Sequence, residues 1–182
     1  MELNPQIKVT ISGPRVYLRS LAAFDATPEY CSWLNDPEVY KYLEVRGVTL
    51  EDVRAYIAKR NVDPNALLLG IFDKDNDRHM GNIKLEPIDW DKKTAVFGIV
   101  VGDKNYWRKG YGTEATRLII DYAFQKLGLK EIILGFVSEH EAARKSYERA
   151  GFSYVRTDKK ALCYDGISYD EIIMSIKKDH NS

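Results

Sequence analysis

Short apolar runs separated by polar turns recur along this chain, and they predict strands that alternate with helices. The apolar runs are rich in Val, Ile and Leu, which favour a buried, pleated surface. Strands are predicted over residues 15–20, 66–72, 80–87, 95–102, 130–137, 153–157 and 168–176. A polar turn at 73–78 joins the second and third of these strands, and a loop at 158–166 separates the last two.

Helices are marked by apolar spacing of three and four residues and by start signals. Asp36-Pro37-Glu38 marks a start inside a helical pair at 25–43, because an N-cap acid followed by proline favours a first helical turn. Thr49-x-x-Asp52 predicts a capped helix that runs to about Arg60. A later helix is predicted from one apolar face, formed by Ala115, Leu118, Ile119, Tyr122 and Ala123. The alternation of strands and helices predicts an α/β fold, but it does not distinguish one α/β fold from another.

The composition suits a single globular domain over residues 1–182. The chain is 45% hydrophobic and 30% charged, and it has no internal repeat, low-complexity tract or linker. Its 27 Lys and Arg balance 27 Asp and Glu, so no global charge favours nucleic acid or an anionic membrane as a partner. No apolar run reaches the roughly 20 residues that span a bilayer.

The cysteines and the first residues bear on the compartment. Cys31 and Cys163 are the two cysteines, and neither belongs to a metal-ligand spacing. The first residues lack the basic and apolar segments of a secretory signal. We therefore expect reduced thiols, no bound metal and a cytoplasmic location.

Residues 107–115, Trp-Arg-Lys-Gly-Tyr-Gly-Thr-Glu-Ala, carry the strongest chemical signal in the chain. This basic turn lies between the strand predicted at 95–102 and the start of a predicted helix. Free N–H groups at a helix N-terminus, the helix dipole and the close approach that glycine allows all favour an anion such as a diphosphate. The glycine spacing excludes a Walker P-loop, and the position past the middle of the chain disfavours a Rossmann fingerprint.

The same stretch resembles the pyrophosphate loop of the GNAT N-acetyltransferases, Gln/Arg-x-x-Gly-x-Gly/Ala, in the form typical of their RimJ/RimL-like branch. The resemblance implies that acetyl-CoA binds here as acetyl donor, mostly through backbone amides. Trp107 stands where the family usually has Gln or Arg, as it does in much of that branch. The alternative is a glycine-rich turn that only caps a helix. The resemblance assigns cofactor contacts to Arg108, Lys109, Gly110, Tyr111, Gly112 and Thr113.

A second motif follows at the distance that the family requires. His140-x-x-Ala143-x-x-x-Tyr147-x-x-x-Gly151-Phe152 resembles the family pattern Asn-x-x-Ala-x-x-x-Tyr-x-x-x-Gly-Phe. Glycine directly after the last helical residue is the ordinary stop signal of a helix. The resemblance covers residues 80–155 best. It implies a mixed α/β fold of the GNAT type, with a largely antiparallel central sheet of about seven strands and helices on both faces.

The resemblance also implies roles for a strand and for a tyrosine. In this family the backbone of one splayed strand binds the pantetheine arm and the thioester, which maps onto Ile99, Val100 and Val101. The family tyrosine protonates the departing thiolate, so Tyr147 is the candidate general acid. Periodicity alone also allows Tyr147 to be a core residue on the apolar face of its helix.

Two further assignments stay open from the sequence. His140 replaces the family asparagine that contacts the pantetheine arm, so the resemblance implies a cofactor contact. Ser138-x-x-Glu141 also has the form of a capping box, which would leave His140 exposed in a first helical turn. The resemblance points to Glu86 as the general base. Asp89 and Glu44 are alternatives, and a solvated carboxylate is the default for all three.

The acceptor site is expected among the segments 36–48, 86–91 and 158–166. The resemblance implies an N-acetyltransferase in which a primary amine attacks the thioester directly. Balanced charge, and a 158–166 loop long enough to wall a compact pocket, favour a small amine such as an amino sugar. The alternatives are a ribosomal-protein N-terminus, a polyamine, or a non-catalytic acyl-CoA-binding module. We expect a monomer or a homodimer.

Overall fold

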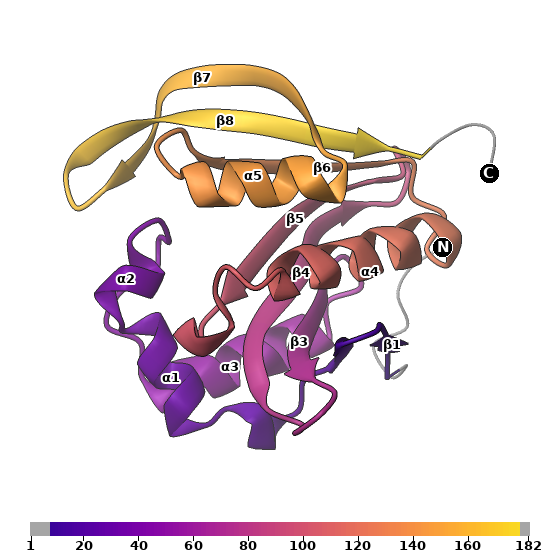
Figure 1. The fold of residues 1–182 in the computed structure, drawn as a ribbon, viewed down its shortest axis with the longest axis vertical. Coiled ribbons are helices and arrows are strands. Elements are labelled where there is room, and N and C mark those ends of the chain that lie inside the picture. Colours follow the sequence, from indigo (N-terminus) through magenta and orange to yellow (C-terminus); the bar gives the residue numbers. More distant parts are fainter. Residues whose placement is uncertain (1–7, 179–182) are drawn as a thin grey trace.

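One sheet of eight strands forms the centre of the molecule, in the order β1-β2-β3-β4-β5-β6-β8-β7 (Figure 1). The computed structural model describes residues 8–178. The pair β5–β6 is parallel, and the other neighbouring strands are antiparallel. The strands are β1 Thr10–Ser12, β2 Val16–Ser20, β3 Leu67–Asp73, β4 His79–Asp89, β5 Thr94–Val101, β6 Glu131–Val137, β7 Ser153–Tyr164 and β8 Ile167–Lys177.

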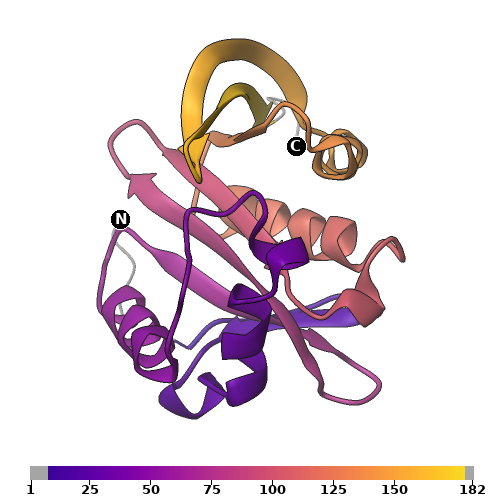
Figure 2. The ribbon, with the colours of Figure 1, turned by 90° about the vertical axis from the view of Figure 1, so that its left-hand side faces the viewer.

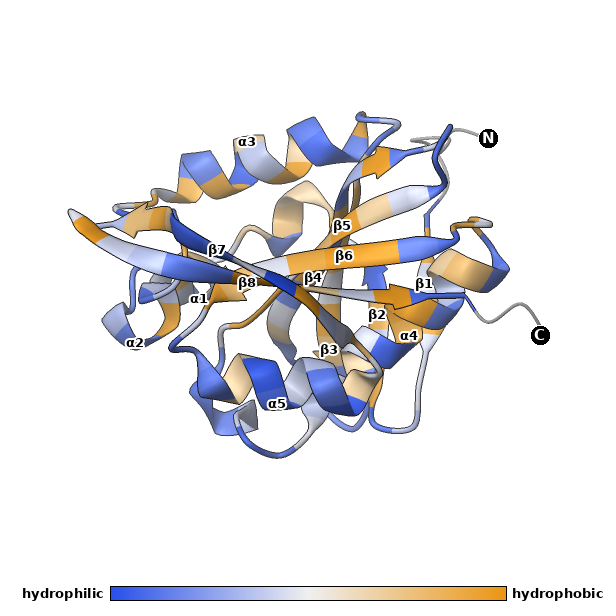
Figure 3. Cartoon of the chain, turned by 90° about the horizontal axis from the view of Figure 1, so that it is seen from above, coloured by the Kyte–Doolittle hydropathy of each residue, from blue (hydrophilic) through white to orange (hydrophobic). Residues whose placement is uncertain are grey.

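Helices cover both faces of the sheet. Helices α1 and α3 pack on one face, and α4 and α5 pack on the other, so that α3 and α5 lie on opposite sides in Figure 3. The core is divided accordingly: Ile119 of α4 is buried in the larger apolar cluster, and Ile57 of α3 in the smaller. Between residues 8 and 178, no helix has the length and apolar character needed to cross a membrane. The helices are η1 Ala23–Asp25, α1 Pro28–Leu34, α2 Pro37–Tyr40, α3 Leu50–Asn61, η2 Lys104–Tyr106, α4 Tyr111–Gln125 and α5 Glu141–Ala150.

Local signals in the sequence set several helix ends. The Asp36 side chain accepts a hydrogen bond from the Glu38 N–H at 2.9 Å, and Pro37 is the first residue of α2. Thr49 and Asp52 form a reciprocal capping box at the start of α3. Gly151 follows α5 with φ of 102°, a left-handed conformation that glycine adopts without strain. These predicted starts and stops are confirmed.

Strands β5 and β6 separate part way along their length. They pair only through Thr94–Val96 and Glu131–Ile133, although each continues well beyond this point. On their outer edges β5 stays paired with β4, and β6 with β8. Figure 2 shows β7, β8 and α5 grouped at one end of the molecule, away from α1 and α3. The opened strands therefore leave backbone groups that face a gap inside the sheet.

The sequence predicted this architecture with two errors. The mixed α/β fold, the largely antiparallel sheet and the helices on both faces are confirmed, but β1 pairs with β2 and makes eight strands where about seven were expected. The predicted loop at 158–166 is wrong, because β7 continues to Tyr164. A turn at Asp165-Gly166 joins β7 to β8, and both residues have positive φ (50° and 78°), as in the two-residue hairpin turns that Asp-Gly favours.

Candidate functional site

The turn between β5 and α4 is held against the end of β5. The Trp107 indole N–H donates a hydrogen bond of 2.7 Å to the Val101 carbonyl, and the Asp103 side chain accepts one of 2.9 Å from the Asn105 N–H. Trp107, which replaces the Gln or Arg of the resembled motif, thus fixes the turn to the strand. Arg108 and Gly110 both have positive φ, 58° and 83°. These bonds and left-handed residues give the turn a defined shape before any ligand binds.

The N-terminus of α4 presents free amide groups at the end of this turn. The first backbone bond of the helix runs from the Glu114 N–H to the Gly110 carbonyl at 3.0 Å, so the amides of 111–113 precede it. A side chain at Gly112 would begin 3.4 Å from Val101, which places the helix start against β5. Because Arg108 and Lys109 are exposed beside these amides, the site combines free N–H donors, positive charge and a helix dipole.

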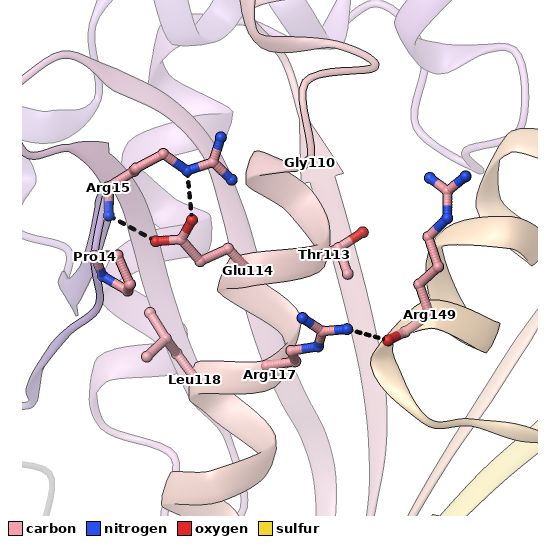
Figure 4. Close-up of a pocket in the computed structure, with 8 residues that line it drawn as sticks. All are labelled: Pro14, Arg15, Gly110, Thr113, Glu114, Arg117, Leu118 and Arg149. Carbon is pink, nitrogen blue, oxygen red and sulfur yellow. Dashed lines mark hydrogen bonds and ion pairs between the residues drawn. The ribbon is translucent and has the colours of Figure 1, made fainter.

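The acidic residue of this first turn is neutralised by an arginine that lies directly before β2. Glu114 accepts hydrogen bonds from the Arg15 side chain at 2.8 Å and from the Arg15 backbone N–H at 2.7 Å (Figure 4). Burial raises the pKa of the Glu114 carboxyl, but these hydrogen bonds outweigh burial and hold the pKa below its usual value. Arg15 also donates to the Lys109 carbonyl at 3.0 Å. Glu114 therefore braces the turn and adds little repulsion toward an anion.

A cavity of about 460 Å³ adjoins the same turn. Gly110 and Thr113 line it at the N-terminus of α4, and three arginines, Arg15, Arg117 and Arg149, line it from the bend before β2, from α4 and from α5 (Figure 4). Sequence reasoning missed these arginines, because none belongs to either motif and they meet only in the folded chain. The cavity extends the positive charge of the turn along α4.

Helix α5 brings the second motif to the first. The hydroxyl groups of Thr113 and Ser146 lie 2.9 Å apart and join α4 to α5. The next residue, Tyr147, is half-buried among Phe97, Phe136 and Phe152, with ring centroids 5.4–6.0 Å away. Burial raises the pKa of Tyr147 to about 12.

The backbone of β5 alternates between the two edges of the strand. The Gly102 N–H donates to the Met80 carbonyl at 2.9 Å, so the groups of Gly102 point toward β4. By alternation, Val100 also pairs with β4, whereas Ile99 and Val101 turn their backbone groups toward the gap. The bond from Trp107 to the Val101 carbonyl agrees with this direction.

His140 lies at the N-terminus of α5 and contacts a distant loop. No capping box forms from Ser138, whose hydroxyl donates to Glu139, and His140 itself is the N-cap residue. Its ring lies 4.5 Å from that of Tyr42. Burial, helped by the nearby charge of Lys41, lowers the pKa of His140. The expectation of an exposed first-turn histidine is therefore wrong, and a contact with the pantetheine arm stays a prediction.

The candidate base Glu86 lies on the face of β4 that α3 covers. Its carboxylate pairs with Arg60 at 3.0 Å and with Lys84 at 3.1 Å. Burial would raise the pKa of Glu86, but the two cations lower it below its usual value. The carboxylate of the alternative base, Asp89, caps its own turn. It accepts a hydrogen bond of 2.9 Å from the Lys92 backbone N–H and pairs with the Lys92 ammonium group at 3.0 Å. These bonds keep both carboxylates ionised.

Two of the three predicted acceptor segments meet. Arg46 pairs with Asp165 at the tip of the β7–β8 hairpin, 3.1 Å away, and its guanidinium covers the Tyr40 ring. A cavity of about 310 Å³ opens beside this contact, lined also by Glu44 and Tyr164. The third segment, 86–91, is tied elsewhere, since the Trp90 indole donates to the Pro64 carbonyl at 3.1 Å. Across residues 8–178, no three His, Cys, Asp or Glu side chains gather in a form that could hold a metal ion.

Comparison with known proteins gives one family. Residues 15–153 match the family model described as an acetyltransferase (GNAT) domain. An uncharacterised N-acetyltransferase, p20, of Bacillus licheniformis is 31% identical over 127 residues, which cover 68% of this chain and 70% of that protein.

Solved structures share the fold. A GNAT-family acetyltransferase from Bacillus anthracis superposes with a TM-score of 0.81 at 24% identity, over 93% of this chain and 98% of that one. The spermidine N-acetyltransferase of Vibrio cholerae, in complex with CoA and spermine, superposes with a TM-score of 0.81 at 21% identity, over 90% and 95% of the two chains.

Proposed function

This chain belongs to the GNAT family of N-acetyltransferases, and on that premise we propose that it moves the acetyl group of acetyl-CoA to a small primary amine. The observation that carries the proposal is the convergence of three features. The free amides of α4, the opened edge of β5 and Tyr147 of α5 all lie along one path beside the β5–β6 gap.

The turn before α4 would bind the diphosphate of acetyl-CoA, and strand β5 would bind its pantetheine arm and thioester. The amides of 111–113, with the charges of Arg108 and Lys109, would hold the diphosphate at the N-terminus of α4. The backbone groups of Ile99 and Val101 would bind the pantetheine arm and thioester in the gap. Val100, whose backbone pairs with β4, would contribute only its side chain.

Acyl transfer needs a neutral amine, a stabilised carbonyl oxygen and a stabilised leaving thiolate. Backbone N–H groups of β5 that face the gap are the candidate donors to the carbonyl oxygen. Tyr147 is the candidate donor to the sulfur, because its hydroxyl has no hydrogen bond to another residue in the range 8–178.

The pKa of Tyr147 refines its role. Burial raises the pKa of Tyr147 above that of a free phenol, so Tyr147 does not readily give up its proton completely to a thiolate. Tyr147 would therefore donate a hydrogen bond to the sulfur as the C–S bond breaks. It would complete the proton transfer only by accepting the second proton of the attacking amine.

The acceptor would approach from the face opposite α4 and α5. The contact between Arg46 and Asp165 closes one side of a cavity of about 310 Å³, a volume that suits a small amine such as an amino sugar. The guanidinium of Arg46 is also bound to the carbonyls of Tyr40 and Val45, so it serves this closure and is not free for a phosphate. A polyamine is the second candidate, since Glu44 lines the cavity without an ion pair in residues 8–178.

An acceptor screen tests the proposal. The protein is incubated with acetyl-CoA and glucosamine, an amino-sugar nucleotide, spermidine, or peptides with the N-termini of ribosomal proteins, and free thiol and acetylated products are measured. We expect kcat/KM to be highest for a small amine. A far higher value for a peptide would overturn the acceptor class. Donor binding without turnover of any amine would favour a non-catalytic acyl-CoA-binding module.

A further inference from the structure

Two glycines flank the opening between β5 and β6 on the face opposite α4 and α5. The last paired residues are Val96 and Ile133, so Gly98 and Gly135 are level with each other, two residues into the gap. Phe97 and Leu134 point into the core on the α4 side, and alternation turns both glycines to the other face. Val96 on that face is 41% exposed. The acceptor side of the gap is therefore bordered by backbone without side chains.

A charged side chain lies across each of these glycines. A side chain at Gly98 would begin 3.2 Å from the Cε atom of Lys84, which Glu86 holds through its ion pair. A methyl group at position 135 would overlap the carboxylate of Glu171, which extends from β8 over β6. One edge of the opening thus carries a paired ammonium group, and the other carries a carboxylate.

The carboxylate of Glu171 differs from that of Glu86 in its partners. Glu171 is half-buried and has no hydrogen bond or ion pair with another side chain in the described part of the chain. Burial raises the pKa of Glu171, and the negative charges of Asp158 and Glu44 raise it further, while Arg156 acts in the opposite direction. Arg156 is itself bound to Asp158 through both carboxylate oxygens, at 2.9 Å and 3.1 Å.

We propose that Glu171 is the carboxylate that receives the acceptor's ammonium group at this opening and takes its proton. The inference rests on the proposed acetyl transfer and assigns a base to it. The proton passes from the ammonium nitrogen to a Glu171 oxygen, and the neutral amine attacks the thioester carbon. The N–C bond forms, the C–S bond breaks, and the second amine proton reaches the sulfur through Tyr147. Glu171 then releases its proton to water.

The experiment compares Glu171→Gln with Glu86→Gln and with a control, Glu131→Gln, which changes a half-buried carboxylate that pairs with Lys177 at the far end of β6. The amine with the highest rate among glucosamine, spermidine and an N-terminal peptide serves as acceptor. We expect Glu171→Gln to lower kcat/KM on the order of 100-fold near neutral pH, with an unchanged Kd for acetyl-CoA. The control variant should match the unmodified protein.

The pH profile separates a base from a structural residue. With Glu171, kcat/KM should fall only as pH drops below the pKa of this carboxyl. In Glu171→Gln the amine must arrive uncharged, so kcat/KM should climb with pH toward the pKa of the amine and the defect should shrink. A defect of constant size at every pH would overturn the proposal. A loss confined to Glu86→Gln would also overturn it and would assign the base to Glu86.

A second variant, Gly135→Ala, tests the proposal if the Glu171→Gln protein fails to fold. Gly135→Ala would push the carboxylate away from the opening, so we expect a similar fall in kcat/KM, while Gly128→Ala at an open turn has no such effect. Unchanged turnover in Gly135→Ala would contradict the placement of Glu171. If the unmodified protein binds acetyl-CoA and acetylates none of the amines, the proposed function fails, and the Glu171 proposal fails with it.

Discussion

The hydroxyl groups of Thr113 and Ser146 lie 2.9 Å apart, although the two residues are 33 positions apart in the sequence. Thr113 belongs to the first turn of α4, where the amides are free, and Ser146 precedes Tyr147 in α5. The contact sets the distance between the candidate diphosphate site and the candidate acid. A shift of α5 relative to α4 would therefore misplace Tyr147 without touching the loop.

The first prediction concerns the loop. Gly110→Asp should weaken acetyl-CoA binding at least tenfold, or about 1.4 kcal/mol, because a carboxylate would face the diphosphate at the N-terminus of α4. Isothermal titration measures the Kd. Gly128→Asp is the matched control, since Gly128 also has positive φ and lies at an open turn beyond the other end of α4. Equal affinity in the Gly110 and Gly128 variants would remove the diphosphate from this loop.

The sequence predicted the elements whose ends carry strong local signals. The Thr49–Asp52 capping box and the Gly151 stop act within a few residues, so they can be recognised in the sequence alone. The second half of β7, residues 158–164, was predicted as a loop because its polar residues resemble one, and pairing with β8 keeps them in a strand despite an irregular register after Asp158. The Asp165-Gly166 turn was the signal that could have placed the hairpin.

The site was predictable only where backbone groups and short motifs define it. The loop glycines and Tyr147 belong to spaced motifs that are visible in the sequence. Arg15 reaches Glu114 across 99 positions, and Glu171 reaches Gly135 through strand pairing, so neither relationship leaves a local pattern. The predicted base Glu86 illustrates the same limit, because the sequence does not reveal that Arg60, 26 positions away, is one of the two cations that lower its pKa.

The second prediction tests the role of Tyr147. Tyr147→Phe should lower kcat on the order of ten- to a thousand-fold, because the departing sulfur loses its hydrogen-bond donor. The Kd for acetyl-CoA should change little, since the phenyl ring keeps its contacts with Phe97 and Phe136. Steady-state kinetics and titration provide the two values. Tyr122→Phe, a half-buried tyrosine of α4, is the control, and unchanged kcat in Tyr147→Phe would transfer the donor role to water or another group.

The third prediction concerns the pH dependence of stability. Burial lowers the pKa of His140 below its usual value of about 6.5, so the unfolded chain takes up this proton at a higher pH than the folded chain does. The free energy of unfolding should therefore decrease as pH falls through about 6.5 and below. His140→Asn removes that contribution and should flatten this part of the profile in urea unfolding. Identical profiles would show that the stacked ring stays accessible to protons.

The last prediction separates binding from stability at the acceptor cavity. The Arg46–Asp165 contact is an ion pair with side chains 28% and 68% exposed, and such pairs contribute little to folding. Loss of the ion pair in Arg46→Ala should therefore barely affect the Tm, and loss of the hydrogen bonds to the Tyr40 and Val45 carbonyls should lower the Tm by only a few degrees. It should nevertheless raise the KM for the amine roughly tenfold, because the hairpin tip and the loop at 41–48 would no longer close the cavity.

Two comparisons make this prediction specific. Arg54→Ala removes an exposed arginine of α3 that pairs with Glu51, and it should change neither the Tm nor the KM for the amine. The Kd for acetyl-CoA should be the same in both variants, because Arg46 lines the acceptor cavity and is not among the residues that line the cavity beside the α4 loop. If Arg46→Ala weakened acetyl-CoA binding and left the KM for the amine unchanged, the cavity beside Asp165 would belong to the donor, and the acceptor would have to enter elsewhere.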